Sequence, residues 1–203
     1  MKVICVDRTY PEHCQIKGNT HFSPLIFFLK PETALLHRNR PFYIPEWTKQ
    51  VEYGVELVLK VCKNGKYIQE RFANTYYNEI GIGIDFTARD LQDELMALGQ
   101  PWEKAKSFDL SAPLGTFLAK EQLNLKQGIR FSLNKNAEIC QSGNSLDMIC
   151  NFDTIIAEVS QYITLRTGDL IFTGSPSNVG TLQVGDVLEA FIEGERLLRV
   201  PVK

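Results

Sequence analysis

Residues 80–92 have the sequence IGIGIDFTARDLQ, and they join a predicted strand to a predicted helix. The apolar residues Ile80 to Ile84 predict a short strand, and its two glycines are typical of close backbone approach. The helix is expected to follow at once, because Thr87 is a good N-cap with Asp90 three residues later. Asp85 would then stand where the strand ends and the helix begins, a common position for a functional side chain.

The predicted helix has one apolar face. Its apolar side chains recur at helical spacing, at Ala88, Leu91, Leu95 and Leu98. Gly99 and Pro101 are expected to end the helix. Arg89, Gln92 and Asp93 share the face away from the leucines.

The clearest strand prediction covers residues 51–61. Apolar side chains alternate on one face of it, at Val51, Tyr53, Val55, Leu57, Leu59 and Val61. Glu52, Gly54 and Glu56 lie on the opposite, more polar face. Asn64-Gly65 then predicts a hairpin turn.

The remaining pattern favours an α+β fold. A second helix is predicted near Phe152 to Ile163, and the last forty residues are rich in strands, including 170–172 and 187–191. Strands dominate, and no regular alternation of strand and helix is visible. The absence of repeats, low-complexity tracts and linkers predicts a single domain over residues 1–203.

The composition excludes several classes of protein. The chain has 203 residues, a formal net charge of −2 and 44% hydrophobic residues, which is enough for a full core and too much for disorder. The balanced charge argues against a general binder of nucleic acid or anionic membranes. No apolar run approaches the roughly 18 residues of a membrane span. The scattered cysteines, without a CxxC pair, are typical of reduced thiols and favour a cytoplasmic protein.

Three charged residues stand out, and each also has an ordinary structural interpretation. Asp85 is either a functional carboxylate or a cap for the helix. Glu56 projects from the polar face of a strand, where solvation alone would explain it. Lys106 follows the predicted helix and is otherwise a surface charge. The residues taken singly leave these alternatives open.

The motifs are more specific in combination. Three stretches carry the pattern, at residues 84–92 (IDFTARDLQ), 101–108 (PWEKAKSF) and 168–176 (GDLIFTGSP). A weaker match lies at Arg8-Thr9-Tyr10 with His13. In this order they resemble the fumarylacetoacetate hydrolase family, in particular its short single-domain branch of acylpyruvases, oxaloacetate decarboxylases and 2-hydroxyhepta-2,4-diene-1,7-dioate isomerases.

The resemblance implies both a fold and a chemistry. The fold would be a β-rich mixed-sheet roll of the fumarylacetoacetate hydrolase C-terminal domain type, with a few short helices. A Glu-x-Glu on one strand and an aspartate on another would hold a divalent metal, Mg²⁺ in the first place and Mn²⁺ or Ca²⁺ as alternatives. That cation would chelate the 2-oxo end of a small acid substrate. The resemblance also implies a homodimer.

This chain departs from the implied metal site. Aligned with the family pattern, Glu56 takes the second glutamate position and Asp85 the aspartate position, but Gly54 stands at the first glutamate. Glu52 lies about 7 Å further along the strand, two residues at roughly 3.3 Å each, so it would substitute only if the strand shifted or bulged. We therefore expect weaker metal binding, with water or substrate completing the coordination.

A second departure concerns the catalytic dyad that the resemblance implies near the N-terminus. His13 takes the histidine position, but Ile16 replaces the glutamate three residues later. An aliphatic side chain accepts no proton, and Glu12 is adjacent to His13 rather than one helical turn away. His13 is a catalytic candidate, with a surface histidine as the alternative.

The other residues implied by the resemblance would bind the substrate. Lys106 and Gln92 would contact its carboxylate or oxo group, and Lys106 would stabilise an enolate. Thr173 and Ser175 would line the pocket. Arg89 would belong to the same substrate site, orienting neighbouring acids more than touching the substrate.

Two hypotheses follow for the function. Decarboxylation and tautomerisation mainly need a stabilised enolate, whereas hydrolysis also needs an activated water, so the departures favour the first two reactions. The alternative is a degenerate family member that binds 2-oxo acids with little or no turnover, because Gly54 and Ile16 replace a metal ligand and a catalytic glutamate.

Overall fold

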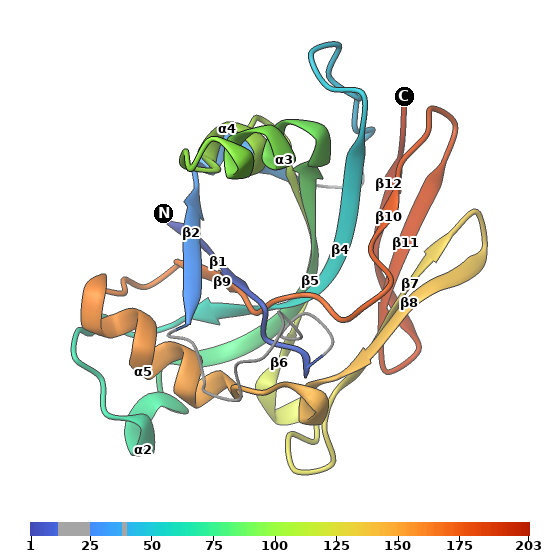
Figure 1. Cartoon of the computed structure of the whole chain (residues 1–203). Coiled ribbons are helices and arrows are strands. Elements are labelled where there is room, and N and C mark those ends of the chain that lie inside the picture. Colours follow the sequence, from blue (N-terminus) through green and yellow to red (C-terminus); the bar gives the residue numbers. More distant parts are fainter. Residues whose placement is uncertain (12–24, 38–39) are drawn as a thin grey trace.

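The chain folds into two β-sheets with a few short helices (Figure 1). The computed structural model describes residues 1–11, 25–37 and 40–203. The larger sheet contains, in order, β2 (Ile26–Lys30), β1 (Val3–Asp7), β9 (Leu170–Phe172), β4 (Val51–Val61), β5 (Tyr77–Ala88), β6 (Ala112–Ala119) and β3 (Leu35–His37), with β10 (Gly180–Thr181) beside β4. The smaller sheet contains β12 (Glu195–Pro201), β11 (Val187–Ile192), β7 (Arg130–Lys135) and β8 (Glu138–Asn144).

Strand directions make the larger sheet mixed and the smaller one antiparallel. In the larger sheet β1 pairs in parallel with β9 and β3 with β6, while the remaining neighbours are antiparallel. All pairs of the smaller sheet are antiparallel. This arrangement confirms the predicted α+β, β-rich mixed-sheet fold.

The helices gather in two places. Figure 1 shows α3 (Arg89–Ala97) and α4 (Glu103–Lys106) together at one end of the larger sheet, and α2 (Glu70–Ala73) with α5 (Phe152–Tyr162) away from them. Within the described residues, short 3₁₀ turns lie at Glu32–Ala34, Lys120–Gln122 and Ser145–Asp147. None of the described helices has the length and apolar character needed to span a membrane.

Strand β4 has the predicted bounds but a different environment. The prediction that one of its faces is solvated is wrong, since Glu56 is only 3% exposed. The reason is that apolar side chains cover both faces of the sheet. Val55 belongs to the main core, which also contains residues of the smaller sheet, and Val58 belongs to a second cluster with Phe172 on the opposite face.

The predicted hairpin turn at Asn64-Gly65 is wrong. Although β4 and β5 are antiparallel neighbours, their connection contains α2, and Gly65 forms an isolated bridge with Leu165. A Cβ at Gly65 would lie 2.4 Å from the ring of Tyr76. The glycine therefore serves close packing rather than a tight turn.

Strand β5 continues past its predicted end at Ile84. Its pairing with β4 runs on to Ala88, which lies opposite Val51. Thr87 is thus a strand residue, and its prediction as an N-cap is wrong; α3 begins after Ala88, which makes no side-chain cap. Strand pairing outweighs the local capping signal, and it places Asp85 within the strand instead of at its junction with the helix.

The C-terminal predictions are confirmed. Helix α5 spans Phe152–Tyr162, and the Asn151 side chain caps it by accepting a hydrogen bond from the Thr154 N–H. The two predicted apolar strands of the C-terminal region are β9 and β11. Parallel pairing with β1 brings β9 into the middle of the larger sheet.

Gly83 of β5 lies close to the Phe172 ring of β9, and this contact gives a stability prediction. A Cβ at Gly83 would lie 2.4 Å from Cε1 of Phe172 and 3.0 Å from Cγ2 of Val58. We expect Gly83→Ala to lower the free energy of unfolding by about 1–3 kcal/mol, because a packed core must shift. Urea unfolding measures this change. Thr116→Ala, at an exposed position of β6, is the control and should change it by about 0.5 kcal/mol or less; equal effects would contradict the prediction.

Candidate functional site

A pocket of about 210 Å³ lies beside β1, β4, β5, α3 and α4. Most of the predicted site residues line it, namely Glu56, Asp85, Arg89, Gln92, Lys106 and Ser175. Phe28, Met96 and Trp102 add apolar walls, and Arg8 adds a further cationic side chain. The predicted His13 and its neighbour Ile16 lie outside the described residues.

The Asp85 carboxylate forms ion pairs with two lysines at the pocket. Its Oδ2 accepts a hydrogen bond from Lys106 Nζ at 2.6 Å, and its Oδ1 lies 2.7 Å from Lys30 Nζ. Burial raises the pKa of Asp85, but Lys106 and Lys30 outweigh it, so the pKa stays below its ordinary value. The side chain is a buried anion between two cations, not a helix cap.

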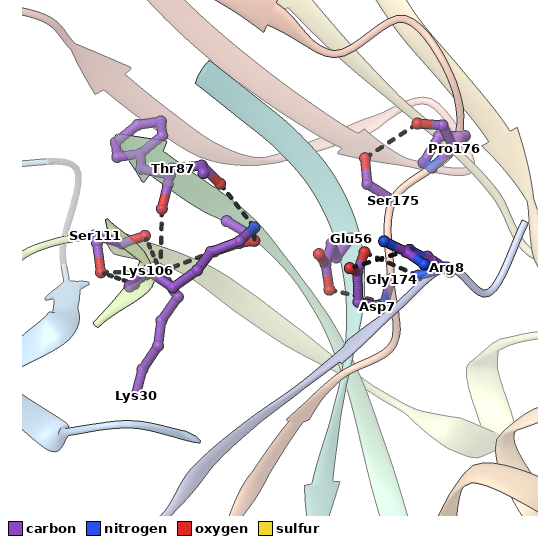
Figure 2. A network of polar contacts seen from close by, with 12 residues as sticks. Asp7, Arg8, Lys30, Glu56, Thr87, Lys106, Ser111, Gly174, Ser175 and Pro176 are labelled. Atoms are coloured by element: carbon purple, nitrogen blue, oxygen red, sulfur yellow. Dashed lines mark hydrogen bonds and ion pairs between the residues drawn. The ribbon is translucent and has the colours of Figure 1, made fainter. Parts of the chain in front are cut away.

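Lys106 is held in place by β5. Its Nζ donates to Asp85 and to Thr87 Oγ1, the latter at 2.7 Å (Figure 2). Burial lowers the pKa of this ammonium group, but the negative charge of Asp85 outweighs burial, so the pKa lies above its ordinary value. Lys106 is therefore a fixed positive charge on the pocket wall, and its interpretation as a surface charge is wrong.

Lys30, the second cation on Asp85, belongs to none of the sequence motifs. Its Nζ also donates to Ser111 Oγ at 2.9 Å and to the backbone carbonyls of Phe86 at 3.2 Å and Ser111 at 3.1 Å. The carbonyl of Lys106 accepts from it as well. No local pattern distinguishes Lys30 from an ordinary strand-end lysine, because all of these partners are more than fifty positions away in the chain.

Glu56 lies deep in the same pocket. Its Oε2 accepts a hydrogen bond from the Gly174 N–H at 2.8 Å (Figure 2). Burial raises the pKa of Glu56, and the nearby charge of Asp85 raises it further. The interpretation of Glu56 as a solvated residue is therefore wrong, and the pocket contains a carboxylate whose ionisation is costly.

Ser175 fills the space beside Gly54. A Cβ at Gly54 would lie 2.8 Å from Ser175 Oγ and 2.9 Å from Ser175 Cβ. Buried Gln141 fixes that serine, because its Nε2 donates to Ser175 Oγ and to the carbonyls of Pro176 and Ser177 while its Oε1 accepts from the Val55 N–H. Gln141, on β8, belongs to none of the sequence motifs, so nothing in the sequence points to this role.

Glu52 does not take the place of the missing ligand. The pairing of β4 with β5 is regular from Val51 to Lys60, without the bulge that would bring Glu52 inward. Its Oε1 instead accepts a hydrogen bond from Gln50 Nε2 at 2.9 Å. Glu52 lines the pocket, two residues before Gly54 in the chain.

The donor set allows only a sparse divalent-metal site. Within the described ranges no group of three or more His, Cys, Asp or Glu side chains is arranged to hold a metal ion. Glu56 and Asp85 do face one pocket, and Asp85 Oδ1 accepts no well-directed hydrogen bond despite its ion pair with Lys30. These two carboxylates fit a cation whose other ligands come from substrate or water.

The remaining predicted residues divide into two groups. Gln92 is buried at the pocket, and Arg89 lines it while its guanidinium forms an ion pair with Asp93 at 2.8 Å. Thr173 differs, because it is completely buried and its hydroxyl donates to the Leu57 carbonyl at 3.0 Å. Thr173 supports the backbone beneath the pocket and is not one of the residues that line it.

Comparison with known proteins identifies the family. A sequence model described as "Fumarylacetoacetate (FAA) hydrolase C-terminal" matches residues 2–203. The chain belongs to the fumarylacetoacetate hydrolase family. It is 37% identical over 201 residues to the oxaloacetate tautomerase FAHD1, mitochondrial, of Mus musculus, covering 99% of this chain and 91% of the relative. It is also 37% identical over 197 residues to the oxaloacetate tautomerase YcgM of Escherichia coli strain K12, covering 97% and 90%.

A solved structure extends the comparison to the fold. Fumarylpyruvate hydrolase from Pseudomonas aeruginosa, crystallised in complex with Mn²⁺ and pyruvate, superposes with a TM-score of 0.90 at 30% identity and covers 100% of this chain and 90% of that one. The family predicted from the motifs is thus confirmed. The chain is an enzyme of the fumarylacetoacetate hydrolase family, whose named relatives act on small oxo acids.

The raised pKa of Glu56 gives a pH-dependent prediction. An acid whose pKa is higher in the folded than in the unfolded protein contributes stability below its unfolded pKa of about 4.3, and this stability is lost as the pH rises toward the folded value. We therefore expect Glu56→Gln to raise the melting temperature at pH 7–8, in EDTA, and to have a smaller effect near pH 4. Thermal unfolding across this range measures the difference, and Glu52→Gln is the control. A Gln variant less stable than the parent at pH 8 would contradict the prediction.

The contact between Gly54 and Ser175 gives a second prediction. We expect Gly54→Ala to lower the free energy of unfolding by about 1–3 kcal/mol, because Ser175 occupies the space of the new methyl group. In a Ser175→Gly background the same substitution should cost less. A double-mutant cycle by urea unfolding measures the coupling, and strict additivity would show that the two positions do not compete for space.

Proposed function

We propose that this enzyme tautomerises or decarboxylates small 2-oxo dicarboxylic acids of the oxaloacetate class. The observation that carries the proposal is the Lys106 ammonium, fixed by Asp85 and Thr87 on the wall of a polar pocket. Both reactions pass through an enol or enolate, whose oxygen carries the developing negative charge. A preorganised ammonium group stabilises that charge without reorganising during the reaction. The two oxaloacetate tautomerases similar to this chain support the substrate class.

Lys106 would stabilise the same enolate in both reactions. In decarboxylation the bond between C3 and C4 breaks, carbon dioxide leaves, and the electron pair moves toward the C2 oxygen, where Lys106 faces the new charge; a proton at C3 then gives the 2-oxo acid. In tautomerisation a proton moves between the enol oxygen and C3, and Lys106 stabilises the same enolate. Gln92 and Ser175 would bind and orient the substrate, while Arg89, paired with Asp93, would orient neighbouring acidic side chains.

A divalent cation would belong to the same site. The Mn²⁺ of the similar fumarylpyruvate hydrolase supports this part of the proposal, with Mg²⁺ as the predicted ion. Glu56 and Asp85 are the side chains that would hold it. When bound, it would chelate the 2-oxo acid and withdraw charge from its oxygen.

Hydrolysis of acylpyruvates is the second candidate reaction, because fumarylpyruvate hydrolase is among the similar structures. It requires a base that activates water, and His13 is the proposed residue for that role. If no turnover occurs while pyruvate still binds, the degenerate alternative is correct. We further propose a homodimer in the cytoplasm, which light scattering and cell fractionation would test.

Substitution of Lys106 tests the proposed function. We expect Lys106→Met to lower kcat for oxaloacetate tautomerisation or decarboxylation by about 10²-fold or more, because it removes the charge that stabilises the enolate. Lys104→Met, at an exposed position of the same short helix, is the matched control and should keep full activity. Rates follow from the loss of enol absorbance and from pyruvate formation. Equal activity of Lys106→Met and the parent would overturn the role of Lys106.

A further inference from the structure

Lys30 is a charged side chain that solvent does not reach. Its side chain is 0% exposed, while that of Lys106 is 11% exposed. Acceptors from β5, from α4 and from Ser111 surround its ammonium group. The charge of Lys30 is therefore fixed beside Asp85 whether or not a ligand is bound.

This fixed charge matters for cation binding. The charged side chains at the pocket balance by formal charge: four are acidic and four are basic, namely Asp7, Glu52, Glu56 and Asp85 against Arg8, Arg89, Lys106 and the buried Lys30. Burial and the charge of Asp85 raise the pKa of Glu56, which favours its neutral form, so the site has no surplus of negative charge. Gly54 adds no carboxylate, and Ser175 occupies the space beside it. A divalent cation that enters the pocket alone would find Asp85 already paired with the ammonium groups of Lys30 and Lys106. No excess of negative charge would attract the cation.

A 2-oxo acid changes this balance. Its carboxylate brings one negative charge, and together with the oxo oxygen it offers two oxygen ligands of the kind that hard divalent cations prefer. Cation and acid should then bind better together than either does alone, and such a coupling is reciprocal by thermodynamic necessity.

We propose that Lys30 is a positioning residue that couples metal binding to substrate binding. The Lys30 ammonium group pairs with Asp85 and so holds Asp85 and Lys106 in place when no metal is bound. Its positive charge opposes metal binding until a 2-oxo acid enters. This inference rests on the proposed function for the identity of the acid, but it concerns binding and not turnover.

The alternative is that Lys30 only fills and satisfies the interior. The two roles predict opposite signs for one measurement. If Lys30 is merely structural, its removal displaces Asp85 and weakens metal binding. If it opposes the metal, its removal leaves a more negative site and strengthens metal binding, provided that the variant folds.

Binding of Mn²⁺ to the wild-type chain is the first test. Electron paramagnetic resonance measures free Mn²⁺, with and without saturating pyruvate, and pyruvate without protein corrects for complexes in solution. We expect pyruvate to tighten Mn²⁺ binding by about tenfold or more, and Mn²⁺ to tighten pyruvate binding by the same factor in calorimetry. Micromolar Mn²⁺ binding that pyruvate leaves unchanged would overturn the inference.

Substitution of Lys30 is the second test. We expect folded Lys30→Met to bind Mn²⁺ alone about tenfold more tightly than the parent and to respond less to pyruvate. Lys30→Arg keeps the charge and should resemble the parent. Lys60→Met is the control and should leave Mn²⁺ binding unchanged. Lys60 is an exposed lysine on β4, the strand of Glu56, and it pairs with Glu79 of β5.

The outcomes of these tests separate the inference from the proposed function. Unchanged or weaker Mn²⁺ binding by folded Lys30→Met would overturn the inference, even if the wild type turns over oxaloacetate. If Lys30→Met does not fold, the wild-type coupling between Mn²⁺ and pyruvate decides. Intact coupling without any turnover would instead overturn the proposed function and leave the role of Lys30 supported.

Discussion

The ion pairs of Asp85 with two lysines are the constraint on which the site depends. Removing a carboxylate and an ammonium from water costs several kcal/mol per group, in order of magnitude, so a buried charge persists only with matched partners. Asp85 forms ion pairs with Lys30 from β2 and Lys106 from α4 at the same time. Because Lys30 also binds the Lys106 carbonyl, the position of the short α4 helix is tied to the charge balance of the pocket.

Local patterns predicted the elements well where one physical effect dominated. Alternating apolar residues predicted the bounds of β4, and α5 differs from its predicted span by one residue at its C-terminal end. The end of β5 was mistaken because Thr87 carries a capping signal, whereas its neighbours continue to pair with β4. Competition between a local preference and a long-range pairing cannot be judged from the residues of one segment.

The site was predictable in its membership but not in its contacts. The family pattern named Asp85, Lys106 and Glu56, but the second ion pair of Asp85 comes from Lys30 of β2, which no motif connected to it. Gly54 appeared as the loss of one ligand. The structure adds that Ser175 fills the space, and that Gln141 from the smaller sheet fixes Ser175. The contacts of Ser175 with Gly54 and Gln141 join residues far apart in the chain, so no periodic pattern in the sequence predicts them.

Lys30 and Lys106 share one carboxylate, but their surroundings give them different capacities. Lys30 binds backbone carbonyls within the interior, so its charge can only stabilise the fold and set the local potential. Lys106 donates to Asp85 and Thr87, lies 5.2 Å from the ring centroid of Phe28 and lines the pocket, so its charge is partly accessible from the pocket. The two ammonium groups therefore differ in access: that of Lys30 is a fixed counter-charge in the interior, and that of Lys106 is a charge on the pocket wall.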